Sequence, residues 1–135
     1  MKSVILAAGK GTRMKGLTSE LPKPMLPVEG KPILEHILEG LTAAGVRDFC
    51  IVTGWHADAI RNHFGDGSRL GVNIAYAHQA VQDGTGKAPE VAKAFVGNDP
   101  FLLTYGDILV KPDTYRRMLS RWSEAEFSGL MTVTA

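Results

Sequence analysis

Short apolar runs alternate with segments of helical periodicity along this chain, and this alternation limits the fold more than any other feature. The apolar runs that predict strands cover residues 2–7, 49–53, 72–78 and 101–104. The intervening segments predict helices over residues 33–44, 57–64 and 88–95, and a further helix follows Pro112. Strands that alternate with helices build a mainly parallel sheet with helices packed on its faces. We therefore expect one α/β domain.

The ends of the predicted helices carry their own signals. Pro32 stands at the start of the first helix, where a proline is tolerated, and Gly45 stands where helices commonly end. Between them, apolar side chains recur at helical spacing: Ile33, Ile37, Leu38, Leu41 and Ala44. After Pro112 the expected packed face is formed by Tyr115, Met118, Leu119 and Trp122. The last apolar run, residues 130–135, predicts a strand that stops with the chain, so we expect a truncated domain.

Composition argues against several classes of protein. The 135 residues are 44% hydrophobic and 21% charged, with a net charge of +1, so the sequence-wide positive field of nucleic-acid binders is missing. Residues 1–31 nevertheless hold six basic and two acidic residues, against nine basic and twelve acidic residues in the remainder. That asymmetry suits a small anionic ligand near the N-terminal segment. No apolar stretch approaches the roughly 18 residues of a membrane span, and we expect a cytoplasmic protein.

The cysteine and the histidines do not predict a site. The single cysteine, Cys50, lies in an apolar run and is expected to pack as a small apolar residue. The four histidines, His36, His56, His63 and His78, show no paired spacing typical of metal ligands. Chemistry is therefore expected elsewhere in the chain.

The first strand opens into a loop that predicts a phosphate site. Ala7-Ala8-Gly9 leads into Lys10-Gly11-Thr12-Arg13, at the beginning of an unusually long loop over residues 8–31. Small residues at a strand end let the backbone approach a ligand and point successive N–H groups at phosphate oxygens. The dinucleotide-binding pattern would require glycine at position 14, which is methionine, and the Gly-Lys-Ser/Thr of a P-loop is not found. The loop therefore needs another explanation.

Charged side chains complete the predicted site. The Arg13 guanidinium can clamp two phosphate oxygens, and the Lys23 ammonium can place a compact charge beside a reacting phosphoryl group. Asp107 follows the predicted strand 101–104, so its carboxylate is expected at the carboxyl edge of the sheet, where open α/β folds bind ligands. One carboxylate with phosphate oxygens and waters is an ordinary Mg²⁺ arrangement. Each of these residues has a simpler alternative, namely a surface cation or an aspartate that caps a turn.

Three motifs, in order, resemble those of the sugar-1-phosphate nucleotidyltransferases. Leu6-Ala-Ala-Gly-Lys-Gly-Thr-Arg-Met14 with Leu21-Pro-Lys-Pro-Met-Leu-Pro27 is similar to the pattern G-x-G-x-R followed by P-K. The segment from Gln79 to Ala88 resembles the Q-x-x-x-x-G-T-x-x-A segment that borders the nucleobase in uridylyl- and thymidylyltransferases, and Tyr105-Gly106-Asp107 resembles the strand-end aspartate that holds Mg²⁺. The likeness covers essentially the whole chain. It implies a Rossmann-like three-layer sandwich with a mainly parallel sheet, of the nucleotide-diphospho-sugar transferase type.

The resemblance also implies a reaction, in which a sugar 1-phosphate attacks the α-phosphorus of a nucleoside triphosphate, UTP or dTTP favoured, and pyrophosphate leaves. By that likeness Arg13 contacts the departing β- and γ-phosphates, Lys23 the α-phosphate and the sugar phosphate, and Asp107 binds Mg²⁺. The nucleotide-binding residues implied are Leu6, Ala8, Gly9, Gly11, Thr12, Arg13, Gln79, Gly84 and Thr85. Family members typically continue beyond this length with a second metal-binding carboxylate, so residues 1–135 are expected to be the nucleotide-binding part.

Two other interpretations stay open. Enzymes that transfer a nucleotide to phosphocholine, methylerythritol phosphate or a molybdopterin share the glycine-rich loop and the arginine, although their second and third motifs usually differ. A nucleotide-sensing domain would keep the loop without turnover. The sequence does not identify the sugar, and it leaves the oligomeric state open, with a homo-oligomer as one option.

Overall fold

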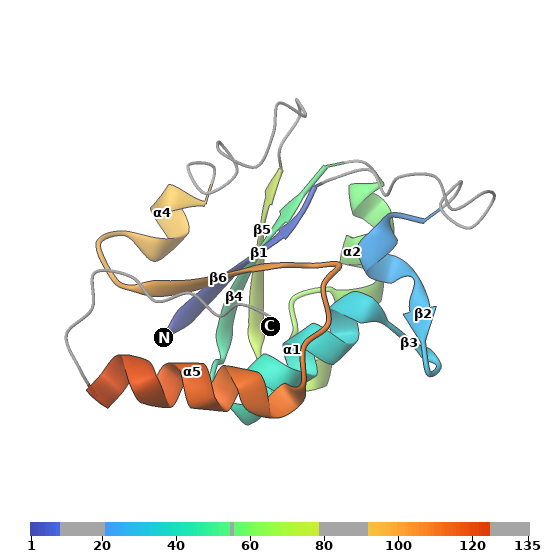
Figure 1. The fold of residues 1–135 in the computed structure, drawn as a ribbon. Helices are drawn as coiled ribbons and strands as arrows, with labels where there is room; N and C mark the ends of the chain where they lie inside the picture. The colour runs from blue at the N-terminus through green and yellow to red at the C-terminus, as the bar shows by residue number, and fades with distance from the viewer. Residues whose placement is uncertain (9–20, 55, 79–91, 125–135) are drawn as a thin grey trace.

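The computed structural model describes residues 1–8, 21–54, 56–78 and 92–124 (Figure 1). Its elements run in the order β1 (Lys2–Ala7), η1 (Lys23–Met25), β2 (Pro27–Val28), β3 (Lys31–Pro32), α1 (Ile33–Ala43), β4 (Asp48–Thr53), α2 (Ala57–Phe64), η2 (Ser68–Leu70), β5 (Asn73–His78), α4 (Lys93–Val96), β6 (Phe101–Tyr105) and α5 (Pro112–Glu124). The predicted helix 57–64 is confirmed at both ends, and the four strands predicted over residues 2–7, 49–53, 72–78 and 101–104 are found within one residue of their expected bounds.

Four strands form one parallel sheet in the order β5-β4-β1-β6. The chain passes from β1 to β4 and on to β5 in one direction, and β6 then returns to pair with the opposite edge of β1. The strand order therefore reverses between β1 and β6. In open α/β sheets, ligands bind outside the carboxyl ends of the strands at such a reversal.

Helices cover both faces of the sheet, which confirms the predicted three-layer arrangement (Figure 1). One buried cluster joins Ile5, Phe49 and Ile51 of the sheet to α1, α2 and α5, and a second joins Val4, Cys50 and Val52 to Val96 of α4. No helix in the described ranges is long and apolar enough to cross a membrane.

The central strand β1 is buried on both faces, which explains its continuous apolar run. Val4, Ile5 and Ala7 are each at most 2% exposed. Ser3 is the polar exception, and its hydroxyl donates to the Leu102 carbonyl oxygen on β6 at 3.2 Å. Because that buried hydroxyl has a partner, the strand carries no uncompensated polar group at this position.

Residues 21–32, most of which were predicted to belong to a loop over residues 8–31, contain regular secondary structure. The one-turn 3₁₀ helix η1 is followed by the antiparallel pair β2 and β3. The two turn residues between these strands, Glu29 and Gly30, have φ values of +52° and +82°, as a tight two-residue hairpin requires. Pro32 ends β3 and is the N-cap residue of α1, which begins at Ile33 as expected.

Two further expectations concern the C-terminal half. Of the helix predicted over residues 88–95, the structure describes α4 at Lys93–Val96, and residues 79–91 lie outside the described part. The strand predicted over residues 130–135 also lies outside it and stays a prediction. The predicted helix after Pro112 is confirmed as α5, and Tyr115, Met118 and Leu119 pack toward the core as expected.

Candidate active site

The site is built where β1 and β6 end side by side. Leu6 of β1 pairs with Tyr105, the last residue of β6. Ala8 is the last described residue before the glycine-rich segment, and Gly106 and Asp107 follow β6. The phosphate-binding segment and the aspartate predicted from the sequence therefore leave the sheet from adjacent strands. This places Asp107 at the strand-order reversal, where the fold favours a ligand site.

Gly106 brings the chain close to β1 at this point. Its backbone N–H donates to the Leu6 carbonyl oxygen at 2.9 Å. A Cβ at position 106 would lie 3.2 Å from the Ala7 Cβ and 3.3 Å from the Leu6 carbonyl oxygen, which is tighter than ordinary van der Waals contact. A glycine here therefore lets the turn pack against β1. This close approach determines the position of the Asp107 backbone, from which its side chain extends.

Lys23 reaches the same place from η1. Its neighbours Pro22 and Pro24 are buried, and Met25 is part of the core beneath the sheet. The turn is closed by hydrogen bonds from the Met25 N–H to the Pro22 carbonyl at 2.9 Å and from the Leu26 N–H to the Lys23 carbonyl at 3.1 Å. The prolines fix φ and pack inward, so Lys23 is held by its neighbours while its own side chain stays 40% exposed.

Lys23 and Asp107 form an ion pair. The Lys23 Nζ lies 3.6 Å from Oδ2 of Asp107, whose side chain is 34% exposed. A pair this exposed contributes about 1 kcal/mol or less to stability, because solvent screens it. The importance of the pair is chemical: it places a cation that can contact a phosphate beside an oxygen ligand that can hold a metal ion.

Several predicted site residues lie outside the described part of the chain: Gly9, Gly11, Thr12, Arg13, Gln79, Gly84 and Thr85. The structure thus brings together Lys23 and Asp107, with Leu6 and Ala8 on the adjoining strand end. Leu6 and Ala8 are 8% and 7% exposed, so a ligand there would meet backbone more than side chain. Sequence reasoning gave Gly106 no structural role, and it overlooked Pro22 and Pro24 as supports of Lys23.

Cys50 and the histidines contribute no metal centre to the described region. The Cys50 thiol is buried, and burial raises its pKa, as expected for a structural cysteine. Within residues 1–8, 21–54, 56–78 and 92–124, no three histidine, cysteine or acidic side chains gather as a metal-binding group. A metal ion at Asp107 would therefore take its other ligands from phosphate oxygens, from water or from residues beyond the described ranges.

Glu35 on α1 is a buried carboxylate. It accepts hydrogen bonds from Arg69 Nη2 at 3.3 Å and contacts His63 Nε2 at 2.8 Å. Burial by itself raises the pKa of Glu35, but the hydrogen bonds from His63 and Arg69 outweigh it and lower the pKa. His63 thus belongs to a hydrogen-bonded cluster that joins α1 to α2 and η2.

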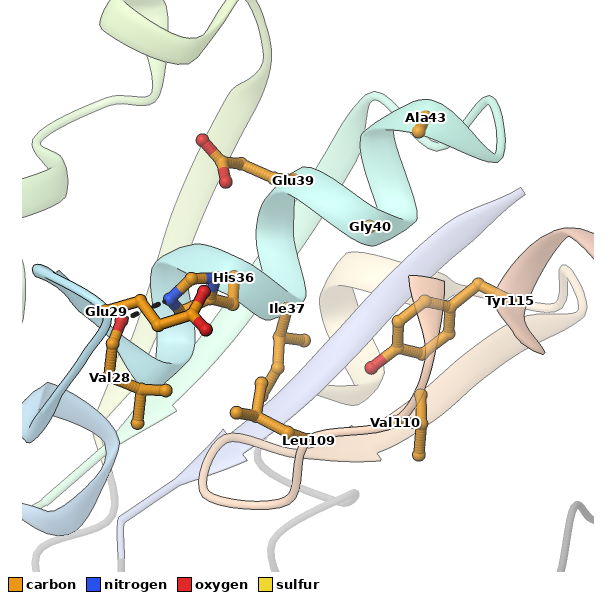
Figure 2. Close-up of a pocket in the computed structure, with 10 residues that line it drawn as sticks. All are labelled: Val28, Glu29, His36, Ile37, Glu39, Gly40, Ala43, Leu109, Val110 and Tyr115. Atoms are coloured by element: carbon orange, nitrogen blue, oxygen red, sulfur yellow. Dashed lines mark hydrogen bonds between the residues drawn. The ribbon is translucent and has the colours of Figure 1, made fainter. Parts of the chain in front are cut away.

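A separate surface cavity of about 430 Å³ lies between α1, the β2–β3 hairpin and the segment before α5 (Figure 2). Figure 2 shows His36 and Tyr115 of α5 on opposite sides of Ile37. The His36 Nε2 lies 2.6 Å from the Val28 carbonyl oxygen. No described residue of the predicted site lines this cavity. The ion pair of Lys23 and Asp107 is therefore a distinct feature of the molecule.

Comparison with protein families supports the sequence motifs. A family model described as nucleotidyl transferase matches residues 2–135. UTP–glucose-1-phosphate uridylyltransferase from Staphylococcus epidermidis is 38% identical in an alignment that covers 84% of this chain and 46% of the relative. The corresponding Staphylococcus saprophyticus enzyme is 37% identical, with 84% of this chain and 47% of the relative covered. The chain spans just under half the length of these relatives.

Solved structures show the same fold. A candidate glucose-1-phosphate thymidylyltransferase from Bacillus anthracis, solved with sucrose, superposes with a TM-score of 0.84 at 29% identity, covering 93% of this chain and 51% of that one. A UDP-glucose pyrophosphorylase in complex with UDP-glucose superposes with a TM-score of 0.78 at 27% identity, covering 91% and 53%. The predicted Rossmann-like architecture is therefore confirmed.

Proposed function

This chain belongs to the nucleotidyl transferase family, and on that basis we propose that it transfers a nucleoside monophosphate from a nucleoside triphosphate to a sugar 1-phosphate. The products are a nucleoside diphosphate sugar and pyrophosphate. The relatives named above as uridylyltransferases favour UTP, and the thymidylyltransferase-like structure keeps dTTP as the second substrate to test. The observation that carries the proposal is the ion pair of Lys23 and Asp107 where β1 and β6 end. We propose a cytoplasmic location, where nucleoside triphosphates are available.

The proposed reaction is a displacement at phosphorus. A phosphate oxygen of the sugar 1-phosphate forms a bond to the α-phosphorus while the bond from that phosphorus to the pyrophosphate oxygen breaks. Negative charge stays on phosphate oxygens throughout, so the protein needs cations and hydrogen-bond donors aimed at those oxygens. Lys23, which is held at the strand ends by η1 and is 40% exposed, would bind the α-phosphate and the sugar phosphate.

Asp107 is the described residue that fits a divalent metal ion, and we propose Mg²⁺. Mg²⁺ is commonly bound by one or two carboxylates together with substrate phosphates and water. Asp107 supplies one carboxylate at the strand-order reversal, beside the cation that would meet the same phosphates. When bound there, the metal ion would neutralise phosphate charge and orient the triphosphate.

Arg13 and the nucleotide-binding residues remain part of the proposal. Arg13 lies in the segment that continues from Ala8, and we assign it to the departing β- and γ-phosphates. Leu6, Ala8, Gly9, Gly11 and Thr12 would present backbone to the nucleotide. The remaining predicted contacts are Gln79, Gly84 and Thr85, which we assign to the base or ribose.

The test is a matrix of substrates. Pyrophosphate release would be measured with UTP, dTTP, GTP, ATP and CTP, each combined with glucose-, N-acetylglucosamine- and mannose 1-phosphate. We expect turnover with UTP or dTTP and at least one of these sugars. Binding of a nucleotide without pyrophosphate release in any combination would instead support a nucleotide-sensing domain. Release that requires a non-sugar phosphate acceptor would support a related nucleotidyltransferase.

A further inference from the structure

The carboxylate of Asp107 already has a cation beside it. The Lys23 Nζ lies 3.6 Å from Oδ2, and both side chains are partly exposed. Lys23 is brought there by η1, which is anchored by buried Pro22, Pro24 and Met25. Asp107 is brought there by the hydrogen bond of Gly106 to Leu6. Each of the two charges therefore has its own backbone support. The pair is not a chance contact between two long surface side chains.

A divalent cation and the Lys23 ammonium would interfere with each other at this carboxylate. A Mg²⁺ ion binds a carboxylate oxygen at about 2.1 Å. An ion on Oδ2 would then lie within about 6 Å of Nζ at its present position. Even with the screening of bulk water, repulsion between a divalent and a monovalent cation at that separation lowers affinity about tenfold.

We propose that Lys23 is the resident counter-ion of Asp107 in the free protein and competes with the divalent metal ion for it. The inference rests on the proposed function, because it takes Asp107 as the metal ligand. Phosphate oxygens of a nucleotide offer Lys23 an alternative partner. Nucleotide binding therefore releases the carboxylate for the metal ion, and the metal enters productively with the nucleotide rather than ahead of it.

Thermodynamic linkage makes this arrangement reciprocal. If the nucleotide raises the affinity for the metal ion by drawing Lys23 away, the metal ion raises the affinity for the nucleotide by the same factor. Removing the Lys23 charge should change the affinities for the metal ion and for the nucleotide in opposite directions. The free protein should then bind the metal ion more tightly, while the nucleotide loses one of its cationic partners.

The experiment measures Mn²⁺ binding to the full chain without nucleotide, using the electron paramagnetic resonance signal of free Mn²⁺ and the relaxation of water protons. Binding that disappears on Asp107→Asn defines occupancy of this carboxylate. We expect Lys23→Met to tighten this Asp107-dependent binding about five- to tenfold. The matched control is Lys31→Met, which also removes one positive charge from a lysine of similar exposure, 42%, paired with Glu39 at 2.7 Å. We expect that control to leave Mn²⁺ affinity within a factor of two.

Three results would overturn the inference. Unchanged or weaker Mn²⁺ binding by Lys23→Met would show that the lysine does not compete. Equal tightening of Mn²⁺ binding by Lys31→Met would show that the effect comes from the overall charge of the protein. Binding that is insensitive to Asp107→Asn in every variant would remove both the metal assignment and the competition. Pyrophosphate release by the wild-type chain is measured separately, so failure of the transfer reaction is distinguished from failure of the competition.

Discussion

The backbone N–H of Gly106 donates a hydrogen bond to the carbonyl oxygen of Leu6, with an N···O distance of 2.9 Å. This bond lies immediately beyond the last paired residues of β1 and β6. It fixes the point from which the Asp107 side chain starts, relative to the end of the central strand. The position of Asp107 therefore depends on how closely the turn after β6 can approach β1.

Substitution Gly106→Ala should displace Asp107. The added Cβ would lie 3.2 Å from the Ala7 Cβ and 3.3 Å from the Leu6 carbonyl oxygen, so the turn must move away by a few tenths of an ångström. We expect a free energy of unfolding lower by about 1–2 kcal/mol and a fall in kcat/KM of about tenfold or more. Urea unfolding and steady-state pyrophosphate release measure the two effects.

Gly45→Ala is the matched control for this substitution. Gly45 follows α1 with φ of +104°, and a Cβ there would have no heavy atom within 4 Å. An alanine should therefore lower stability through backbone strain without touching the turn after β6. If both variants lose kcat/KM in proportion to their loss of stability, Gly106 has no positioning role.

The predicted catalytic charges should matter far more for turnover than for stability. We expect Asp107→Asn and Arg13→Ala each to lower kcat/KM at least about a hundredfold, because each would remove charge stabilisation from the transition state. Since Asp107 is 34% exposed and its ion pair is screened, its loss should change the free energy of unfolding by about 1 kcal/mol or less.

Asp99→Asn serves as the control for loss of an acidic side chain. Asp99 is 73% exposed and pairs with Lys2 at 4.0 Å, away from the Lys23 pair. We expect its kcat/KM to equal that of the wild type. A near-normal kcat/KM of Asp107→Asn or Arg13→Ala, measured with UTP or dTTP, would remove that residue from the mechanism.

The sheet was predictable because its strands are defined by local patterns. β1 is apolar from Val4 to Ala7 because both of its faces are buried there, and the rule for parallel sheets then places Asp107 at the carboxyl edge. The contact between Lys23 and Asp107 was not predictable in the same way. It depends on η1, which forms because Pro22, Pro24 and Met25 pack into the core, and that packing is a tertiary interaction.

The hairpin of β2 and β3 was also not predictable from the sequence, because it too depends on tertiary contacts. Prolines occupy both of its strands, at positions 27 and 32, and proline argues against a strand when the sequence is considered alone. The two-residue pairing is sustained instead by the turn at Glu29 and Gly30 and by α1, to which Lys31 is tied through Glu39 at 2.7 Å. The conformation of such short elements depends on the surrounding structure more than on their own residues.

Cys50 should be unreactive in the folded protein. The side chain is 2% exposed, and burial raises the pKa of its thiol, so little thiolate is present near neutral pH. We expect reaction with a disulfide reagent such as DTNB at pH 8 to be slow in the native state and fast in urea. Cys50→Ala should retain full turnover and lower the free energy of unfolding by about 1 kcal/mol. Rapid native labelling, or loss of turnover in the alanine variant, would contradict this structural role.

Glu35 should give the fold a specific dependence on acid. Its folded-state pKa is lowered from 4.5 because the hydrogen bonds from His63 and Arg69 outweigh the opposing effect of burial. The ionised carboxylate therefore stabilises the folded chain above pH 4.5, and this contribution is lost as the pH falls through the folded-state pKa. We expect Glu35→Gln to lower the free energy of unfolding by about 2 kcal/mol at pH 7, with a smaller difference from wild type below pH 4. Urea unfolding at several pH values measures this, with Glu39→Gln as the exposed control; a difference that stays constant across the range would show that the carboxylate charge is not the cause.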